Sequence, residues 1–210
     1  MRTISRTKKT VAPRRRIGNG CAPGWDPDLR ALRDVVSDYR SEGALRAKSE
    51  REYYQRMPSL QAVLAAAGAA KGSDGKRHPH QRRLSGEVLN RCTRALVACA
   101  REIRATRSFA ALHSLLSDTI GGIRGVGKLM VYDTADRIGV FLDVRPESVY
   151  LHAGVRSGAR ALGLRTSGST IAAAGLPAEL RRVKPWEAED ILCIYKDSKA
   201  FHGYAERRPR

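Results

Sequence analysis

Long apolar stretches are absent from this sequence of 210 residues. The longest strongly apolar run, residues 63–70, is too short to cross a bilayer. The N-terminus also lacks an apolar signal core, so we expect an intracellular protein of the cytoplasm or nucleoid with no membrane partner. Residues 1–16 contain no acid and are rich in Arg, Lys, Ser and Thr, so an organellar transit peptide remains an alternative.

Cysteine is scarce and is not arranged as a ligand set. The four cysteines are Cys21, Cys92, Cys99 and Cys193, and no two of them form a C-x-x-C pair. This spacing argues against a four-cysteine zinc site or an iron–sulfur centre. It also gives no disulfide framework and favours a reducing compartment. We therefore expect no metal and no cofactor.

Positive charge is abundant. The chain has 39 Lys and Arg against 21 Asp and Glu, which gives a formal net charge of +18. Folding has no need for such an excess, and self-repulsion works against a compact state. The usual reason to keep it is a polyanionic partner, so the composition favours binding to DNA or RNA.

The basic residues gather at two places outside the expected helices. Residues 1–24 form a basic, turn-rich arm that we expect to be disordered, and Arg14, Arg15 and Arg16 are its candidate phosphate contacts. The second place is a loop, predicted over residues 71–83. Its candidate contacts are Lys76, Arg77, His78, His80, Arg82 and Arg83. The alternative interpretation of both segments is a solvated surface without a ligand.

Apolar residues elsewhere recur at helical spacing and predict an all-α domain over residues 25–200, followed by a basic tail at 201–210. The clearest stripe is Leu89, Cys92, Leu96, Cys99 and Ile103, in a helix expected over 86–106 with Ser85 as its cap. No segment shows a convincing strand alternation. The remaining helices are expected at about 26–43, 45–57, 59–70, 108–122, 127–142, 146–161 and 185–199. We expect them to form one compact helical bundle.

A turn with two glycines is the most informative motif. It reads Ile123, Arg124, Gly125, Val126, Gly127, Lys128 and joins two of the expected helices. Glycine lets a ligand approach the main chain closely, and the first N–H groups of the following helix have no intrahelical partner. Together with the positive end of the helix they favour an anion such as a phosphate. Residues 124–128 are therefore the central candidate contacts.

This arrangement, over residues 115–142, resembles the helix-hairpin-helix family of DNA-binding elements. The usual hairpin of that family reads h-x-G-h-G, in which h is apolar, and residues 123–127 match every position. The resemblance implies sequence-tolerant contact with the phosphate backbone, with duplex DNA as the favoured partner. A plain helical hairpin with a glycine turn is the alternative.

A wider resemblance, over about 109–199, is to base-excision DNA glycosylases of the same superfamily, but the catalytic positions depart from it. The Schiff-base lysine of bifunctional members falls on Leu129 here. The family's catalytic Asp falls on His152 or Leu151 if the Leu-Gly ending at Leu162 and Gly163 is aligned. It falls on Glu147 if residues are counted from the hairpin. No residue inherits the catalytic role cleanly.

These observations predict a glycosylase-like DNA-binding domain that does not catalyse a reaction. The first alternative is a divergent DNA glycosylase that uses Glu147 or His152. A carboxylate stabilises a developing sugar cation better than a neutral imidazole, which favours Glu147 within this alternative. The second alternative is an RNA-associated or assembly protein whose hairpin packs against a protein partner that the sequence does not identify.

Overall fold

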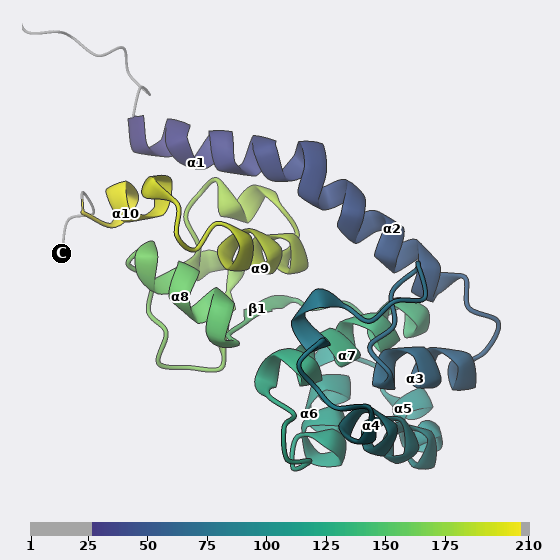
Figure 1. Cartoon of the computed structure of the whole chain (residues 1–210). Helices are drawn as coiled ribbons and strands as arrows, with labels where there is room; N and C mark the ends of the chain where they lie inside the picture. The colour runs from purple at the N-terminus through teal and green to yellow at the C-terminus, as the bar shows by residue number, and fades with distance from the viewer. Residues whose placement is uncertain (1–26, 207–210) are drawn as a thin grey trace, which may run out of the picture.

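The computed structural model describes residues 27–206, so the candidate contacts Arg14, Arg15 and Arg16 lie outside the described residues. Most of the described chain is helical, which confirms the expected all-α class (Figure 1). Buried apolar side chains form two large clusters within this fold. We call the two parts of the molecule around them the helical lobe and the mixed lobe.

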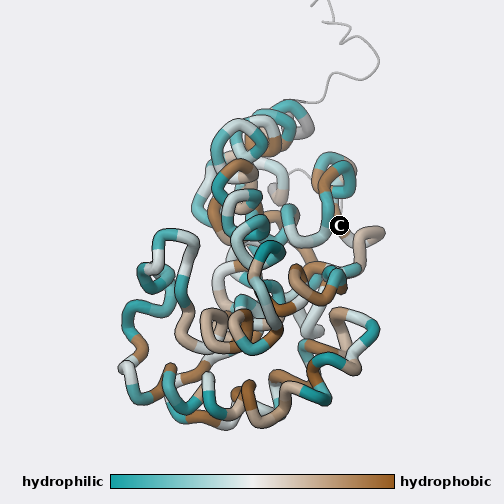
Figure 2. Tube along the Cα trace, turned by 90° about the vertical axis from the view of Figure 1, so that its right-hand side faces the viewer, coloured by the Kyte–Doolittle hydropathy of each residue, from teal (hydrophilic) through white to brown (hydrophobic). Residues whose placement is uncertain are grey.

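One long rod spans both lobes. Helix α1 (Pro27–Asp38) continues through a π-helical turn (Tyr39–Gly43) into α2 (Ala44–Gln55), so the two helices expected here are joined without a break (Figure 1). Hydrophilic and apolar residues alternate along the rod, which Figure 2 shows as teal and brown bands. The apolar stripe of α1 is buried in the mixed lobe, whereas Tyr54 of α2 is buried in the helical lobe.

The helical lobe is built from α2 and five further helices. Serine side chains cap three of these helices: Ser59, Ser85 and Ser108 accept hydrogen bonds of 3.2, 3.3 and 3.2 Å from backbone N–H groups in the first turns. Helix α3 packs against both α4 and α7, which explains why its apolar run is buried on nearly all sides. The helices are α3 (Leu60–Gly68), α4 (Gly86–Ala98), α5 (Ala100–Ala105), α6 (Phe109–Ile120) and α7 (Lys128–Leu142).

The mixed lobe surrounds the second cluster and contains the small sheet. Strands β1 (Ser148–Tyr150) and β2 (Thr170–Ala172) pair antiparallel, with Val149 opposite Ile171. Both of these side chains are buried against the helices of the lobe. The helices are α1, α8 (Ala153–Ala161), α9 (Pro185–Ile194) and α10 (Lys199–Glu206), and short 3-10 turns occur at Ala173–Gly175 and Leu180–Arg182.

Four expected boundaries are wrong. The helix expected over 185–199 ends at Ile194, and a separate helix, α10, begins at Lys199. The helix expected over 86–106 is interrupted at Cys99, where α4 ends and α5 begins. The helix expected over 146–161 starts only at Ala153, because the preceding residues pair with β2. The basic tail expected from residue 201 is helical to Glu206, and Phe201 is fully buried, so these residues belong to the fold.

Candidate nucleic-acid interface

The turn between α6 and α7 has an unusual backbone conformation at Gly125. This residue has a φ of +100°, a conformation that residues with a side chain rarely adopt. The turn is tight: the N–H of Ile123 donates to the Ile120 carbonyl at 3.0 Å, and the N–H of Val126 donates to the Ile123 carbonyl at 2.9 Å. A Cβ on Gly125 would lie 3.7 Å from Val88, which is ordinary contact. The positive φ, and not a lack of space for a side chain, is therefore the reason for glycine at this position.

Gly127 differs from Gly125. It precedes α7 with an extended backbone (φ −104°, ψ 173°), and a Cβ built on it would meet nothing within 4 Å. Neither strain nor internal packing requires glycine at this position. The open space lies beside the first turn of α7, whose N–H groups lack intrahelical partners. Both Gly127 and Lys128 are exposed, so an anion can approach these donors directly.

Val126 anchors the turn between its two glycines. Its half-buried side chain packs against a small cluster formed by Ala70, Leu89 and Met130. Leu84, at the end of the basic loop, packs against the same cluster. The hairpin and the basic loop, which are about forty residues apart in sequence, therefore share one packing unit.

The basic loop is held in place by polar contacts. The Tyr54 hydroxyl donates to the Lys71 carbonyl at 2.6 Å, and the Gln81 amide donates to the Asp133 carboxylate on α7. Arg77 donates to the Leu84 carbonyl at 2.7 Å, and His78 Nε2 lies 2.6 Å from Glu50 Oε1 on α2.

Arg77 and His78 are half-buried and are used in these contacts, so their side chains stabilise the loop. They were expected to contact the ligand directly. The other four candidates of the loop are exposed and free to contact a ligand: Lys76, His80, Arg82 and Arg83.

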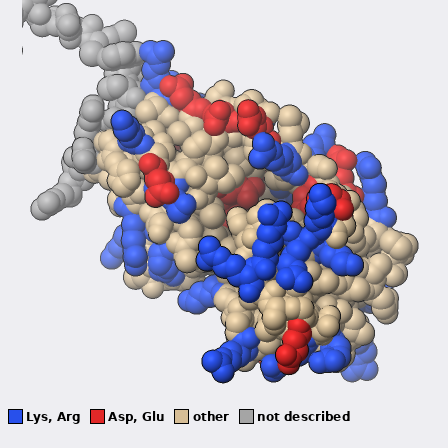
Figure 3. Space-filling model, in the orientation of Figure 1, with Lys and Arg blue, Asp and Glu red and all other residues tan. Residues whose placement is uncertain are grey.

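Exposed cations without an ion-pair partner are numerous in this region of the described chain. In residues 27–206, ion pairs occupy lysines and arginines of the rod and of the mixed lobe, such as Arg33 with Glu179 and Lys48 with Glu52. Between Lys71 and Lys128 no lysine or arginine forms an ion pair with a described residue. Figure 3 shows Lys and Arg side chains gathered across the face that carries this region. The exposed cations are Lys71, Lys76, Arg82, Arg83, Arg91, Arg94, Arg101, Arg104, Arg107, Arg124 and Lys128.

A cavity of about 400 Å³ opens beside the hairpin and between the lobes. Gly127 and Lys128 line one side of it, and β1 with the residues that follow line the other. Its wall contains aromatic rings that contact one another at tilted angles: the ring centroids of His113 and Tyr150 are 4.5 Å apart, and those of Tyr132 and Tyr150 are 5.7 Å apart. We call it the hairpin cavity. An aromatic wall of this kind suits a planar ring.

His152 is the one catalytic candidate that lines this cavity. Its side chain is 2% exposed, and its Nε2 is hydrogen-bonded to the buried carboxyl group of Glu189 on α9. Burial lowers the pKa of His152, whereas burial and the charge of Asp190 raise the pKa of Glu189 well above its usual value. Both groups therefore favour their neutral forms. Nδ1 of His152 has no hydrogen-bond partner in the described part of the chain.

Glu147, the other catalytic candidate, is exposed just before β1 and does not line the hairpin cavity. Leu129, at the position of the Schiff-base lysine, does not line it either. Sequence reasoning did not identify Glu189 as a site residue. The available signal was its position beside the apolar residues Ala188, Ile191 and Leu192 of the same helix, which are buried.

A second cavity, of about 480 Å³, lies along the rod between the lobes and is lined by several carboxyl groups. Burial raises the pKa of Asp136, and burial raises the pKa of Asp190 to about 6. The Arg137 guanidinium is also buried here, 3.9 Å from Glu50 and 3.8 Å from Asp133. Among residues 27–206 no group of His, Cys, Asp and Glu side chains has a metal-binding arrangement.

Comparisons with protein-family models, with curated proteins and with solved structures find no match to this chain. No helix within residues 27–206 has the length and apolar character needed to cross a membrane.

Proposed function

We propose that this protein binds duplex DNA through the phosphate backbone and with little preference for base sequence. The observation that carries this proposal is the set of exposed, unpaired cations that surrounds a glycine turn and the free N-terminus of α7. Surface cations in most proteins are partly compensated by nearby carboxylates. The cations between Lys71 and Lys128 have no such compensation from the described residues, so they are available to phosphates.

The hairpin adds directional contacts to this charge. Main-chain N–H groups at the start of α7 can donate to a phosphate oxygen, and Lys128 adds a positive charge at the same end of the helix. These donors recognise a feature that every nucleotide has. They position the duplex without reading its bases, which is the reason for proposing sequence-tolerant binding.

Catalysis is not part of this proposal. The position that corresponds to the Schiff-base lysine is Leu129, and the exposed Glu147 lies outside the hairpin cavity. The pKa of Glu189 is raised by burial, which favours a neutral carboxyl group that is a poor stabiliser of a sugar cation. We therefore favour a glycosylase-like domain that binds DNA and does not release bases.

A divergent DNA glycosylase is the second candidate, and the hairpin cavity is the observation that favours it. The cavity has aromatic walls, lies beside the hairpin, and includes His152 with its unpartnered Nδ1. Incubation with duplexes that carry uracil, 8-oxoguanine or alkylated bases tests this candidate. Base release above a no-protein control would favour it over the non-catalytic proposal.

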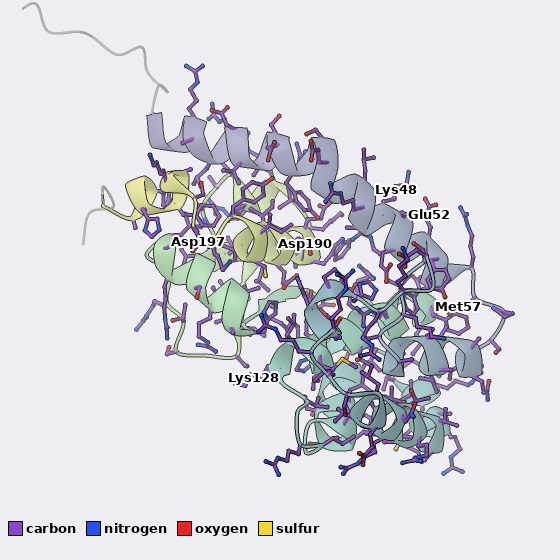
Figure 4. The ribbon with its side chains drawn as sticks, viewed as in Figure 1. Lys48, Glu52, Met57, Lys128, Asp190 and Asp197 are labelled. Atoms are coloured by element: carbon purple, nitrogen blue, oxygen red, sulfur yellow. The ribbon has the colours of Figure 1, made fainter. Side chains whose placement is uncertain are left out.

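The binding proposal is tested by fluorescence anisotropy with a labelled duplex and the full chain. We expect affinity to fall roughly a thousandfold between about 50 and 200 mM salt if about six phosphates are contacted. Lys128→Ala should weaken binding and lower the slope of log affinity against log salt by about 1. The matched control is Lys48→Ala, because Lys48 is exposed on α2 and already paired with Glu52 (Figure 4).

An affinity that does not change with salt would overturn the proposal. The proposal would also fail if two results were found together. Lys128→Ala and Lys48→Ala would bind DNA equally well, and the hairpin variants Gly125→Ala and Gly127→Ala would bind it as the wild type does. Competition between duplex DNA and structured RNA in the same assay distinguishes the RNA-associated alternative, which requires the RNA to compete more strongly.

A further inference from the structure

The segment that connects α8 to β2, residues 163–169, is an exposed loop on the mixed lobe, and we call it the α8–β2 loop. It belongs to a stretch without acidic residues that extends from the residue after Glu147 to the residue before Glu179. Arg165 is exposed, and its guanidinium makes no ion pair or hydrogen bond with a residue in the range 27–206. Hydroxyl side chains follow it at Thr166, Ser167 and Ser169.

Arg156 on α8 holds this loop in a defined conformation. Its guanidinium donates to the carbonyls of Thr166, of Gly168 at 3.0 Å and of Leu151 at 3.4 Å. One arginine thus ties the middle of the loop to the end of β1. Arg160 Nε adds a hydrogen bond of 3.3 Å to the Thr166 hydroxyl. The loop is therefore ordered before any ligand arrives, which lowers the entropy cost of binding.

The loop also has a defined position relative to the hairpin. The N–H of Leu151 donates to the Ser169 carbonyl at 2.8 Å, which fixes the end of the loop beside β1. Ser169 lines the hairpin cavity together with Gly127 and Lys128. Figure 4 shows Lys128 extending from the start of α7 beside the segment that returns from α8. The α8–β2 loop and the hairpin thus lie on the same cavity but belong to different lobes.

We infer that the α8–β2 loop is a second phosphate-binding element, in which Arg165 and the hydroxyls of Ser167 and Ser169 contact the backbone of the nucleic acid held by the hairpin. This inference rests on the proposed function. An exposed arginine and flexible hydroxyl donors on an ordered main chain suit a phosphate group, which accepts several hydrogen bonds at once. The hairpin and the loop together would fix the nucleic acid across the junction between the lobes.

Arg156 is a positioning residue in this account, because its guanidinium is used on three backbone carbonyls. Lysine at this position keeps the charge but cannot reproduce a planar group with five donors. Arg156→Lys should therefore weaken binding without changing the slope of log affinity against log salt. Arg165→Ala should lower that slope by about 0.9, because one phosphate contact is lost.

The test compares Arg165→Ala and Arg165→Glu with Arg181→Glu in anisotropy titrations with a labelled DNA duplex. Arg181 is a matched control, because it is exposed on the same lobe, lacks an ion pair with the described residues and lies outside the α8–β2 loop. We expect Arg165→Glu to weaken binding by about tenfold more than Arg181→Glu does. The Arg165 side chain has no internal partner to lose, so unchanged circular dichroism spectra are expected for both of its variants.

Two outcomes would overturn this inference and leave the proposed function in place. In the first, the Arg165 variants bind DNA as the wild type does, while Lys128→Ala still weakens binding. In the second, Arg165→Glu and Arg181→Glu weaken binding equally, which would indicate a general effect of net charge. If neither the Arg165 variants nor the hairpin variants change binding, the inference and the proposed function both fail.

Discussion

The Tyr39 hydroxyl donates a hydrogen bond of 2.6 Å to Oδ2 of Asp190, and this contact joins the π-helical turn of the rod to α9. Tyr39 is fully buried, and Asp190 lies along the carboxyl-lined cavity between the lobes (Figure 4). A carboxyl group in this position is removed from water, and this desolvation is the main reason that its pKa rises.

Stability should therefore depend on pH through Asp190, and Asp190→Asn should remove that dependence. The pKa of Asp190 is raised from 3.8 to about 6 in the folded chain. A raised pKa means that the folded state binds the proton more tightly than the unfolded state does. The stabilising contribution is present in full below pH 3.8 and is lost as pH rises through 6. The shift corresponds to roughly 3 kcal/mol.

Urea unfolding at pH 5 and pH 8 measures this contribution. We expect Asp190→Asn to become more stable relative to the wild type as pH rises between these values, because asparagine carries no charge. The lowered pKa of His152 makes the free energy of unfolding fall as pH drops below 6.5, which opposes the effect of Asp190. The variant is therefore compared with the wild type at each pH. A difference in free energy of unfolding that stays constant with pH would contradict the prediction.

The two hairpin glycines should respond differently to alanine. Gly125→Ala places a side chain at a φ of +100° and should reduce stability by about 1–3 kcal/mol. Gly127→Ala meets no atom within 4 Å, so its melting temperature should equal that of the wild type. Its Cβ would nevertheless occupy the space through which a phosphate approaches α7, and affinity for duplex DNA should fall by about tenfold or more.

Differential scanning calorimetry and anisotropy titration on the same preparations separate these effects. Normal affinity in the Gly127→Ala variant would show that the first turn of α7 does not contact the ligand. Binding would then depend on the loop and the arm.

Local signals explain which parts of this fold could be predicted from sequence. Ser85 is predicted as a helix cap, and its side chain accepts the expected backbone hydrogen bond. The interruption at Cys99 gave no signal, because the apolar spacing continues from Leu96 to Ile103 and both side chains are buried. β1 was missed because a strand of three residues is too short to show alternation, and its partner is about twenty residues away.

Parts of the candidate site also follow from local sequence signals. The hairpin glycines and the cations around them could be identified from their spacing and composition. The contact of Val126 and Leu84 with one cluster could not, because it depends on how α3, α4 and α7 pack. The partnership of His152 with Glu189, which are 37 residues apart, likewise exists only in the folded chain. Arg77 and His78 resembled their exposed neighbours in sequence, and only the structure shows their internal partners.

Removal of residues 1–16 should weaken DNA binding and leave the melting temperature unchanged. The segment contributes seven basic residues and no acidic residue, so each lost phosphate contact should lower the slope of log affinity against log salt by about 0.9. The described members of both buried clusters form extensive apolar cores within residues 27–206. A clear fall in melting temperature on truncation would show that the arm is a structural part of the domain.

Glu147→Gln and Glu189→Gln together decide between binding and catalysis. Glu147 is exposed and outside the hairpin cavity, so the non-catalytic proposal predicts that Glu147→Gln binds duplex DNA as well as the wild type or slightly better, since a negative charge is removed. Glu189→Gln should also retain DNA binding, because the carboxyl group is buried and cannot contact a phosphate backbone. Neither variant is expected to change a base-release assay, in which the wild type itself should show no activity.

If the wild type releases a damaged base and Glu147→Gln abolishes this release, Glu147 acts on the substrate as a carboxylate and the protein is an enzyme. If Glu189→Gln abolishes it instead while Glu147→Gln does not, the activity depends on the His152–Glu189 pair, and the non-catalytic proposal fails in that case as well.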